Sequence, residues 1–229
     1  MKMYREYEKI QSYMSLFNLE QIFADAALLP IQLREYDSDE YVLSEGNELD
    51  GLYFQVEGLT RVSSSVETGK SLLLRFCHPL SIFGDIELIQ KVVVQSQVQA
   101  VQPSKFLFLD IEFVERKLMQ DYRFLNEMLK HLSYKLQTCT AASRINSLSS
   151  VEERFAIYLM STRLPKEFGK EISTPHIPEI ASVIGTTPRH LNRLIQKLSD
   201  LEILCKKRKG FVVLDWGRVD ELSNGLRYD

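Results

Sequence analysis

Cysteine is scarce in this sequence, and long apolar runs are absent. The 229 residues include three cysteines, Cys77, Cys139 and Cys205, which are odd in number and far apart. They form neither a disulfide framework nor a zinc site, so each is expected to be a small buried residue in a reducing compartment. No stretch approaches the roughly 20 apolar residues that a membrane helix needs, and residues 1–6 lack the apolar core of a signal peptide. These absences predict a cytoplasmic protein that does not contact a membrane.

Signals of catalysis and metal binding are missing too. Of the four histidines, His78, His131, His176 and His190, only His78 lies in the region whose pattern indicates a β-barrel. Metal-dependent barrels usually need two or three histidines with a carboxylate on neighbouring strands. The sequence also has no nucleophile elbow, phosphate loop or metal-ligand spacing. We therefore expect no enzyme, no catalytic residue and no metal site.

The average charge favours no particular partner. The net charge is −3 and the isoelectric point is 5.9, which gives no support to nucleic-acid binding until the charge is divided by region. A composition of 45% hydrophobic and 26% charged residues is typical of a well-packed globular protein. The length allows one large domain or two smaller ones.

Short apolar stretches predict a β-barrel over residues 31–109. Stretches such as 52–56 and 72–76 are separated by regularly spaced turn signals, which is typical of an antiparallel sandwich or barrel. Before the barrel, apolar residues at helical spacing predict one or two short helices within residues 4–28. The turn signals lie at residues 44–47, 57–58, 67–70 and 78–79.

A heptad pattern predicts a long dimerisation helix over residues 111–148. No proline or glycine interrupts this stretch, and apolar residues recur in steps of three and four. The stripe could pack against the protein's own barrel, but a single stripe along about nine turns is better explained by a second copy of the helix. We therefore expect a parallel homodimer. The predicted seam consists of Leu118, Tyr122, Leu125, Leu129, Leu132, Leu136 and Cys139.

Residues 149–229 have the pattern of a winged helix-turn-helix. Two amphipathic segments flank a tight turn at Gly185, and Ala181 is small where the two helices must approach closely. Thr187 is placed to cap the second helix, and Pro188 falls at its first position, where a missing N–H costs nothing.

Flanking elements complete this region. Residues 151–160 are expected to form an amphipathic helix, followed by a linker at residues 164–170. After the second helix, two short strands at residues 203–206 and 211–214 are joined by basic residues. This hairpin would contact the DNA backbone as a wing.

The polar residues on the outward side of the second helix suit a DNA groove. Arginine can pair with guanine and asparagine with adenine, while lysine and threonine suit phosphates. The local charge is positive although the chain is acidic, and this charge on a helix-turn-helix with a wing favours DNA binding over a merely solvated face. The predicted DNA contacts are Thr187, Arg189, His190, Asn192, Arg193, Lys197, Lys207, Arg208 and Lys209.

The order of these parts resembles the CRP/FNR family of bacterial transcription regulators over residues 41–215. Residues 52–58 are similar to the family's strand-turn pattern, residues 69–70 to its next hairpin turn, and residues 83–88 to its effector-pocket segment. The start of the recognition helix, residues 187–191, is similar to the YeiL-like branch. The resemblance implies an α+β fold with a cyclic-nucleotide-binding-like β-barrel (a double-stranded β-helix or jelly roll), a dimerisation helix and a winged helix-turn-helix. It also implies RNA polymerase as a partner.

The effector pocket departs from the family members that bind cyclic nucleotides. Those members have an acidic residue after the pocket glycine and, further along, an arginine–serine pair that holds the cyclic phosphate. Here the acid is Asp85 and the pair is Gln95 and Ser96. Without the arginine no residue supplies a bidentate positive partner for a phosphate, so cyclic AMP is not expected as the effector. The candidate pocket consists of Gly84, Asp85, Ile86, Gln95 and Ser96.

The other cofactors of the family are not expected either. Its iron–sulfur members use a cluster of N-terminal cysteines, but no cysteine precedes Cys77 in this sequence. A haem would depend on His78 alone. The recognition helix has Pro188 and Arg189 where the best-known members have an arginine–glutamate pair, so the DNA site should differ from theirs.

The sequence leads to three functional hypotheses. The first is a dimeric regulator that reads a two-fold symmetric DNA site, with an unknown small-molecule signal. The second is a ligand-binding barrel whose helix-turn-helix serves assembly only. The third is a cupin-like enzyme, which the single barrel histidine excludes. The predicted domains are residues 1–110, 111–148 and 149–229.

Overall fold

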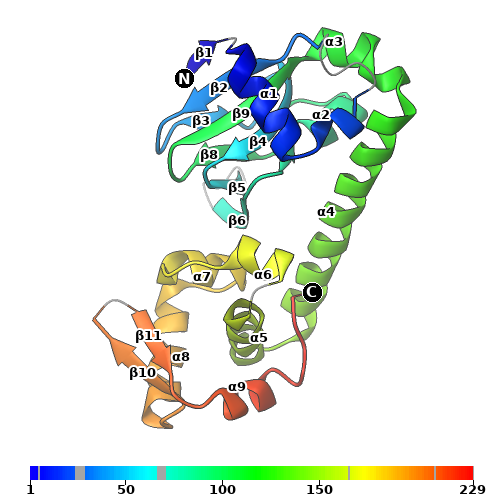
Figure 1. The fold of residues 1–229 in the computed structure, drawn as a ribbon. Coiled ribbons are helices and arrows are strands. Elements are labelled where there is room, and N and C mark those ends of the chain that lie inside the picture. Colours follow the sequence, from blue (N-terminus) through cyan, green and yellow to red (C-terminus); the bar gives the residue numbers. More distant parts are fainter. Residues whose placement is uncertain (5, 24–28, 66–70, 165, 209, 229) are drawn as a thin grey trace. The chain divides into compact units, whose positions relative to one another are not determined.

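The computed structural model describes residues 1–228 apart from residues 5, 24–28, 66–70, 165 and 209 (Figure 1). By their contacts, the residues form two compact units. Unit 1 comprises Met1–Gly69 and Cys77–Lys135, and unit 2 comprises Lys70–Phe76 and Leu136–Asp229. The hairpin turn expected at Gly69 and Lys70, and the wing residue Lys209, lie outside the described residues. The division into three domains at residues 110 and 148 stays a prediction.

The predicted β-barrel consists of two sheets. One has five strands in the order β1-β2-β9-β4-β7, and each neighbouring pair is antiparallel. The other has four strands in the order β3-β8-β5-β6. The strands are β1 (Lys2–Tyr4), β2 (Gln32–Tyr36), β3 (Tyr41–Leu43), β4 (Gly51–Glu57), β5 (Thr60–Ser65), β6 (Ser71–Cys77), β7 (Ile82–Phe83), β8 (Gln97–Ala100) and β9 (Ser104–Asp110).

Alternating side chains of the five-stranded sheet build two separate cores. Leu107 and Leu109 of β9 pack against helices, whereas Phe106 and Phe108 pack between the two sheets. Successive side chains of a strand point to opposite faces, so a sheet that is buried on both faces has continuous apolar strands. This double burial explains the continuous apolar run of β9 and the mostly apolar strand β4, in which the polar Gln55 is also buried.

The helices of unit 1 cover the outer face of the five-stranded sheet and contribute to the helix-side core. Two of them, α1 and η1, account for the helical spacing expected within residues 4–28. Unit 1 contains α1 (Tyr7–Leu16), η1 (Leu19–Gln21), α2 (Asp85–Gln90), α3 (Ile111–Arg116), η3 (Leu118–Gln120) and the first half, to Lys135, of α4 (Tyr122–Leu148).

The helix predicted over residues 111–148 is divided into three segments. Asp110 caps the short helix α3 by accepting two backbone N–H bonds. Asp121 accepts a bond from the N–H of Arg123 at 2.9 Å, and the 27-residue helix α4 begins directly after it. Between the two caps, Leu118 is buried in the core of unit 1. The expectation of one unbroken helix was wrong because Asp121 caps a second helix start within the predicted range.

Unit 2 has the predicted winged helix-turn-helix and two elements that the sequence did not predict. Phe168 and Ile172 are buried one helical turn apart and form α6, where a linker was expected over residues 164–170. A further helix, α9, is capped by Asp215. The elements are α5 (Val151–Arg163), α6 (Glu167–Ile172), α7 (Ile177–Val183), α8 (Pro188–Asp200), β10 (Leu204–Lys207), β11 (Gly210–Val213) and α9 (Trp216–Leu222).

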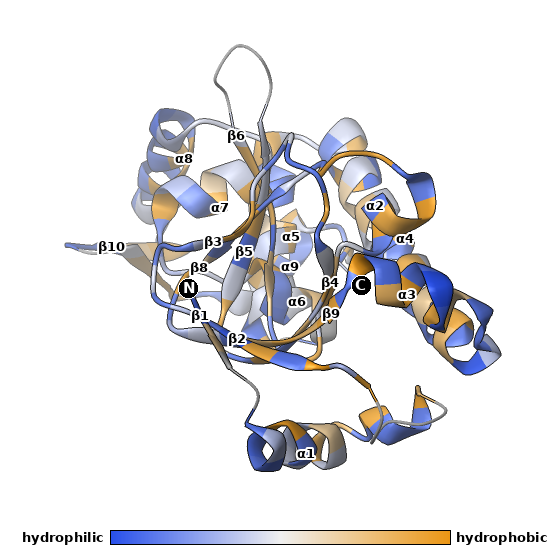
Figure 2. Cartoon of the chain, turned by 90° about the horizontal axis from the view of Figure 1, so that it is seen from above, coloured by the Kyte–Doolittle hydropathy of each residue, from blue (hydrophilic) through white to orange (hydrophobic). Residues whose placement is uncertain are grey.

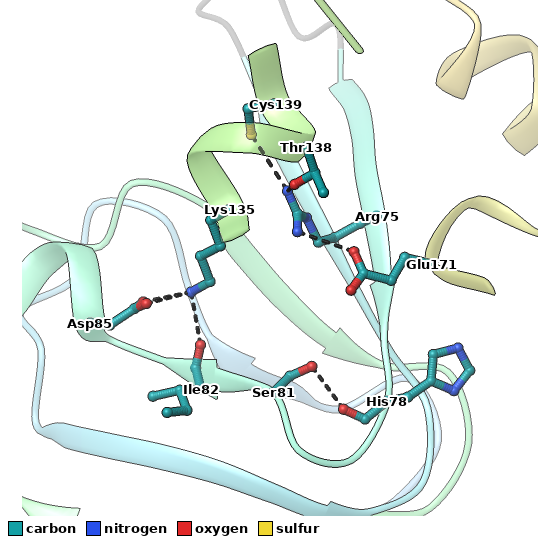
Figure 3. Close-up of polar contacts among 9 residues, drawn as sticks. All are labelled: Arg75, His78, Ser81, Ile82, Asp85, Lys135, Thr138, Cys139 and Glu171. Carbon is teal, nitrogen blue, oxygen red and sulfur yellow. Dashed lines mark hydrogen bonds and ion pairs between the residues drawn. The ribbon is translucent and has the colours of Figure 1, made fainter. Parts of the chain in front are cut away.

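A buried arginine joins three elements of unit 2. Arg75 of β6 donates from Nη2 to Oγ1 of Thr138 in α4 at 2.8 Å. Its Nη1 forms an ion pair with Oε2 of Glu171 in α6 at 3.1 Å (Figure 3). Because a buried charge is costly unless it is paired and hydrogen-bonded, these contacts fix the three elements against one another.

Candidate nucleic-acid interface and effector pocket

The turn between α7 and α8 has the geometry that the sequence predicts. Gly185 has a φ of +64°, in the left-handed region that glycine adopts most easily. The N–H of Thr186 donates to the carbonyl of Ala181 at 2.8 Å. Oγ1 of Thr187 accepts from the N–H of His190 at 3.2 Å and so caps α8. The turn therefore fixes the direction in which α8 leaves it.

The two faces of α8 differ sharply in polarity. Its apolar face is buried in unit 2 and consists of Leu191, Leu194, Ile195 and Leu198. Its other face, largely blue in Figure 2, is hydrophilic. The exposed residues there and at the preceding cap include the predicted DNA contacts Thr187, Arg189, His190, Asn192, Arg193 and Lys197.

The exposed polar side chains of α8 differ in their partners. Arg189 and Arg193 have no hydrogen-bond or ion-pair partner within the described part of the chain. Nζ of Lys197 forms an ion pair with Oε2 of Glu152 at 2.6 Å. Nδ2 of Asn192 donates to a backbone carbonyl of its own helix at 2.8 Å. The two arginines are therefore the cations of α8 that an incoming anion meets without first breaking a contact.

The predicted wing is a two-stranded antiparallel hairpin. Its register runs from Leu204 opposite Val213 to Lys207 opposite Gly210, so each strand is shifted by one residue from its expected bounds. Lys207 and Arg208 are exposed at its end. The ring of Phe211 packs edge-on against Phe155 of α5, with the centroids 5.4 Å apart, and anchors the hairpin to the unit.

At the predicted effector pocket, the acidic residue Asp85 is already engaged in an ion pair within the protein. Asp85 is only 1% exposed, and both of its carboxylate oxygens contact Nζ of Lys135 in α4, at 2.6 and 2.7 Å. The same ammonium donates to the carbonyl of Ile82 at 2.9 Å (Figure 3). Gly84, with a φ of +88°, precedes this segment; a β-carbon there would lie 2.9 Å from the carbonyl of Gly51.

The predicted phosphate end of the pocket also has internal partners. The buried carboxylate of Glu87 accepts the backbone N–H of Gln95 at 3.0 Å. The exposed amide of Gln95 donates to the carbonyl of Val93 at 2.7 Å. Ile86 is exposed and Ser96 is half-buried. A ligand phosphate at this N–H would therefore have to displace a carboxylate of the protein.

An apolar stripe runs along the exposed side of α4. Tyr122, Leu129 and Leu136 are 77%, 62% and 70% exposed and lie seven residues apart. Leu125 and Leu132 are half-buried, and Leu118 precedes the helix and is buried. Cys139 continues the stripe and is exposed, while Cys205 is half-buried. The expectation that each cysteine is buried was therefore right only for Cys77.

The sequence reasoning missed Lys135 and Arg75, and it assigned no role to Glu87 within the effector segment. Lys135 and Arg75 contact residues far away in the sequence, so local spacing carried no signal for them. Within the described residues, no group of three or more histidine, cysteine, aspartate or glutamate side chains could hold a metal ion. No helix among those described is long and apolar enough to cross a membrane.

Comparison with known proteins finds a domain model and a relative that resemble this chain. Residues 33–121 match the cyclic nucleotide-binding domain. The regulatory protein YeiL of Escherichia coli O157:H7 is 24% identical over 198 residues, which cover 85% of this chain and 88% of YeiL. The resemblance to the YeiL-like branch that the recognition helix suggested is thus supported along most of the chain.

Solved structures share the fold. TTHB099, a CRP-family transcriptional regulator from Thermus thermophilus, has a TM-score of 0.67 at 18% identity and covers 86% of this chain and 98% of its own. The c-di-GMP-responsive global regulator CLP of Xanthomonas campestris has a TM-score of 0.68 at 18% identity, with coverages of 80% and 93%. The predicted α+β fold class is confirmed, and the proteins with this fold named here are transcription regulators rather than enzymes.

Proposed function

We propose that this chain, a CRP/FNR-type protein in its fold and its cyclic nucleotide-binding domain, is a transcription regulator that reads DNA as a homodimer. The observation that carries the proposal is the exposed face of α8, where Arg189 and Arg193 have no partner among the described side chains. Two such arginines on the second helix of a helix-turn-helix suit guanine edges in a major groove. Lys207 and Arg208 of the wing suit the phosphates beside it.

Dimerisation is proposed from the stripe on α4. Three large apolar side chains seven residues apart, each more than half exposed, match one seam of a two-stranded coiled coil. The proposed seam comprises Tyr122, Leu125, Leu129, Leu132, Leu136 and Cys139, without Leu118. A two-fold dimer presents two copies of α8, so its DNA site should be two-fold symmetric, with half-sites about one helical turn apart.

The DNA proposal is tested by selecting duplexes from a random pool with the full chain. We expect enrichment of one two-fold symmetric site, and we expect the Arg189→Ala variant to lose that preference. Arg116→Ala is the matched control, because Arg116 is an exposed arginine of α3 outside the interface; it should select the same site. If the unsubstituted chain enriches no sequence, the helix-turn-helix serves assembly rather than DNA reading.

The dimer proposal is tested with the native thiol of the seam. In a parallel two-fold coiled coil each seam residue faces its own copy, so mild oxidation should link Cys139 to the Cys139 of a second chain. We expect the Cys139→Ser variant to stay unlinked and the Cys205→Ser variant to be linked as before. Sedimentation of the reduced protein as a monomer at micromolar concentration would contradict the seam.

The remaining partner and the cellular location are also proposals. Contact with RNA polymerase, which the family resemblance implies, and action in the cytoplasm stay predictions. The internal contacts of Asp85 and Glu87 support the expectation that cyclic AMP is not the effector. Calorimetry with cyclic AMP tests this expectation, and tight binding would contradict it.

A further inference from the structure

Four exposed apolar side chains gather on α2 and directly after it. Ile86, Ile89, Val92 and Val93 are 42%, 43%, 42% and 45% exposed. Single apolar residues are common on protein surfaces, but several in one short segment form a patch of the kind that marks an interaction site. We call these four side chains the α2 patch.

The α2 patch lies beside α4. Asp85, the first residue of α2, contacts Nζ of Lys135 in α4 with both carboxylate oxygens, at 2.6 and 2.7 Å (Figure 3). Ile89 follows Asp85 by four residues, so the two side chains lie on the same side of α2. The ion pair therefore holds the side of α2 that carries Ile89 next to the stretch of α4 around Lys135.

Lys135 flanks the proposed dimer seam. It directly precedes Leu136, whose side chain is 70% exposed, and it takes the g position when the seam residues take the a and d positions. In a parallel two-stranded coiled coil, the g position of one helix lies beside the e position of the following heptad in its partner. Lys135 therefore faces Thr140 of a second chain, and Ile89 faces the same region of that chain.

The e positions of α4 are suited to an apolar contact. They hold Asn126, Ser133, Thr140 and Ser147, which are all exposed and uncharged. Coiled coils often have glutamate or lysine at the e and g positions, where these residues form salt bridges between the helices. Short uncharged side chains form no such bridge with Lys135, and they leave room for another surface to approach α4 closely.

We propose that the α2 patch packs against α4 of a second copy of this chain, around Ser133 and Thr140. The inference rests on the proposed seam, because the register of the seam decides which residues α2 faces. It extends the dimer contact from α4 to the barrel, since each chain then contributes α2 as well as its long helix. The contact is two-fold symmetric and occurs twice in each dimer.

The first test links the two surfaces through thiols placed in different chains. Both chains carry Cys139→Ser and Cys205→Ser; one also carries Ile89→Cys and the other Thr140→Cys. After the chains are mixed and allowed to exchange, a short bismaleimide should link them into a covalent dimer. Neither chain alone should be linked, because the two-fold axis places its two thiols on opposite sides of the coiled coil.

Val101 provides the matched control for this test. It is an apolar residue of unit 1 that is 39% exposed, close to the 43% of Ile89, but it lies after β8 rather than on α2. A chain with Val101→Cys in place of Ile89→Cys should stay unlinked when it is mixed with the Thr140→Cys chain.

The second test measures what the α2 patch contributes to dimer affinity. Ile86→Ser/Ile89→Ser should raise the dimer dissociation constant about tenfold or more, because the dimer then buries less apolar surface. Val101→Ser should leave the dissociation constant unchanged. Sedimentation over a series of concentrations measures both values, and circular dichroism checks that the exposed substitutions leave the fold intact.

The proposal is overturned if the unsubstituted chain sediments as a dimer but the Ile89→Cys and Thr140→Cys chains are not linked. It is also overturned if the double serine variant dissociates as the unsubstituted chain does, and the patch would then belong to a contact with a different protein. Both outcomes leave the seam and the DNA proposal standing. A monomer at micromolar concentration contradicts the seam itself, and the α2 contact falls with it.

Discussion

The exposed face of α8 and the segment that begins with α2 differ in the burial and the partners of their charged groups. On α8, Arg189 and Arg193 are exposed and have no partner among the described residues. At α2, the carboxylates of Asp85 and Glu87 are buried and contact an ammonium and a backbone N–H of the same unit. One region therefore presents charge to an external partner, whereas the other has neutralised its charge internally.

This difference separates the roles of the two regions. An exposed cation is solvated and costs the folded protein little, so it can be kept for recognition. A buried carboxylate is costly without its partner, so its contacts belong to the stability of the fold. Substitutions of the exposed arginines of α8 should therefore change DNA affinity and leave the free energy of unfolding unchanged. Substitutions at Lys135 should mainly lower the free energy of unfolding.

The largest effect is expected from Lys135→Met. This change removes the ammonium and leaves the carboxylate of Asp85 buried without a countercharge. Breaking one side of a buried pair costs about 3–5 kcal/mol, and we expect the lower end because the Lys135 side chain is partly exposed. Urea denaturation followed by circular dichroism measures the loss in the free energy of unfolding.

The double variant Asp85→Asn/Lys135→Met is the control for this effect. It removes both charges, so it should recover a large part of the stability that the single variant loses. Lys117→Met, at an exposed lysine just before η3, should change the free energy of unfolding by less than about 0.5 kcal/mol. A Lys135→Met variant as stable as Lys117→Met would show that the pair does not hold α4.

The next effect is the loss of DNA affinity in Arg193→Ala. If Arg193 makes a paired contact to guanine, its removal should cost about 1–3 kcal/mol and relax the preference at one base position. Fluorescence anisotropy with the selected duplex measures the affinity, and the urea midpoint should not move. Equal weakening on specific and unrelated duplexes would mean that Arg193 contacts phosphate rather than a base.

The winged helix-turn-helix could be predicted from the sequence because its signals are local. Gly185 in the turn, Thr187 as the cap and the apolar positions of α8 all lie within a few residues of one another. Each residue carries its own conformational preference, and these preferences agree with the final structure. The same local agreement predicted β4 from its apolar run.

The contacts of the effector segment could not be predicted because they join distant residues. Asp85 and Lys135 are brought together by the packing of α4 on the barrel, and no spacing rule connects their positions. The heptad pattern also concealed a break: Asp121 begins α4 anew, although the apolar period continues across it. Periodicity describes which face is apolar, but a capping side chain decides where a helix begins.

A smaller effect distinguishes two lysines of the interface. Lys207 has no ion-pair partner among the described residues, whereas Lys197 is paired with Glu152. Lys207→Ala should reduce the slope of log affinity against log salt by about 1, the value for one phosphate contact. Lys197→Ala should reduce it less, because binding by Lys197 first breaks a contact within the protein. Equal changes in slope would remove the distinction between paired and unpaired cations.

The smallest effect is a pH dependence of stability that His131 should bring to unit 1. Burial lowers its pKa from 6.5, with Lys135 and Lys130 acting in the same direction. The carboxylates of Glu127 and Asp85 act in the opposite direction but more weakly than burial. As the pH falls through about 6.5, the unfolded chain binds a proton at this position before the folded chain does, so stability should fall. The decline should end once the folded imidazole is also protonated.

Denaturation curves of the unsubstituted chain and His131→Gln, compared at each pH, isolate this contribution because all other groups are shared. Parallel stability profiles would show that the folded and unfolded chains bind this proton equally, which contradicts burial of the imidazole beside Glu127.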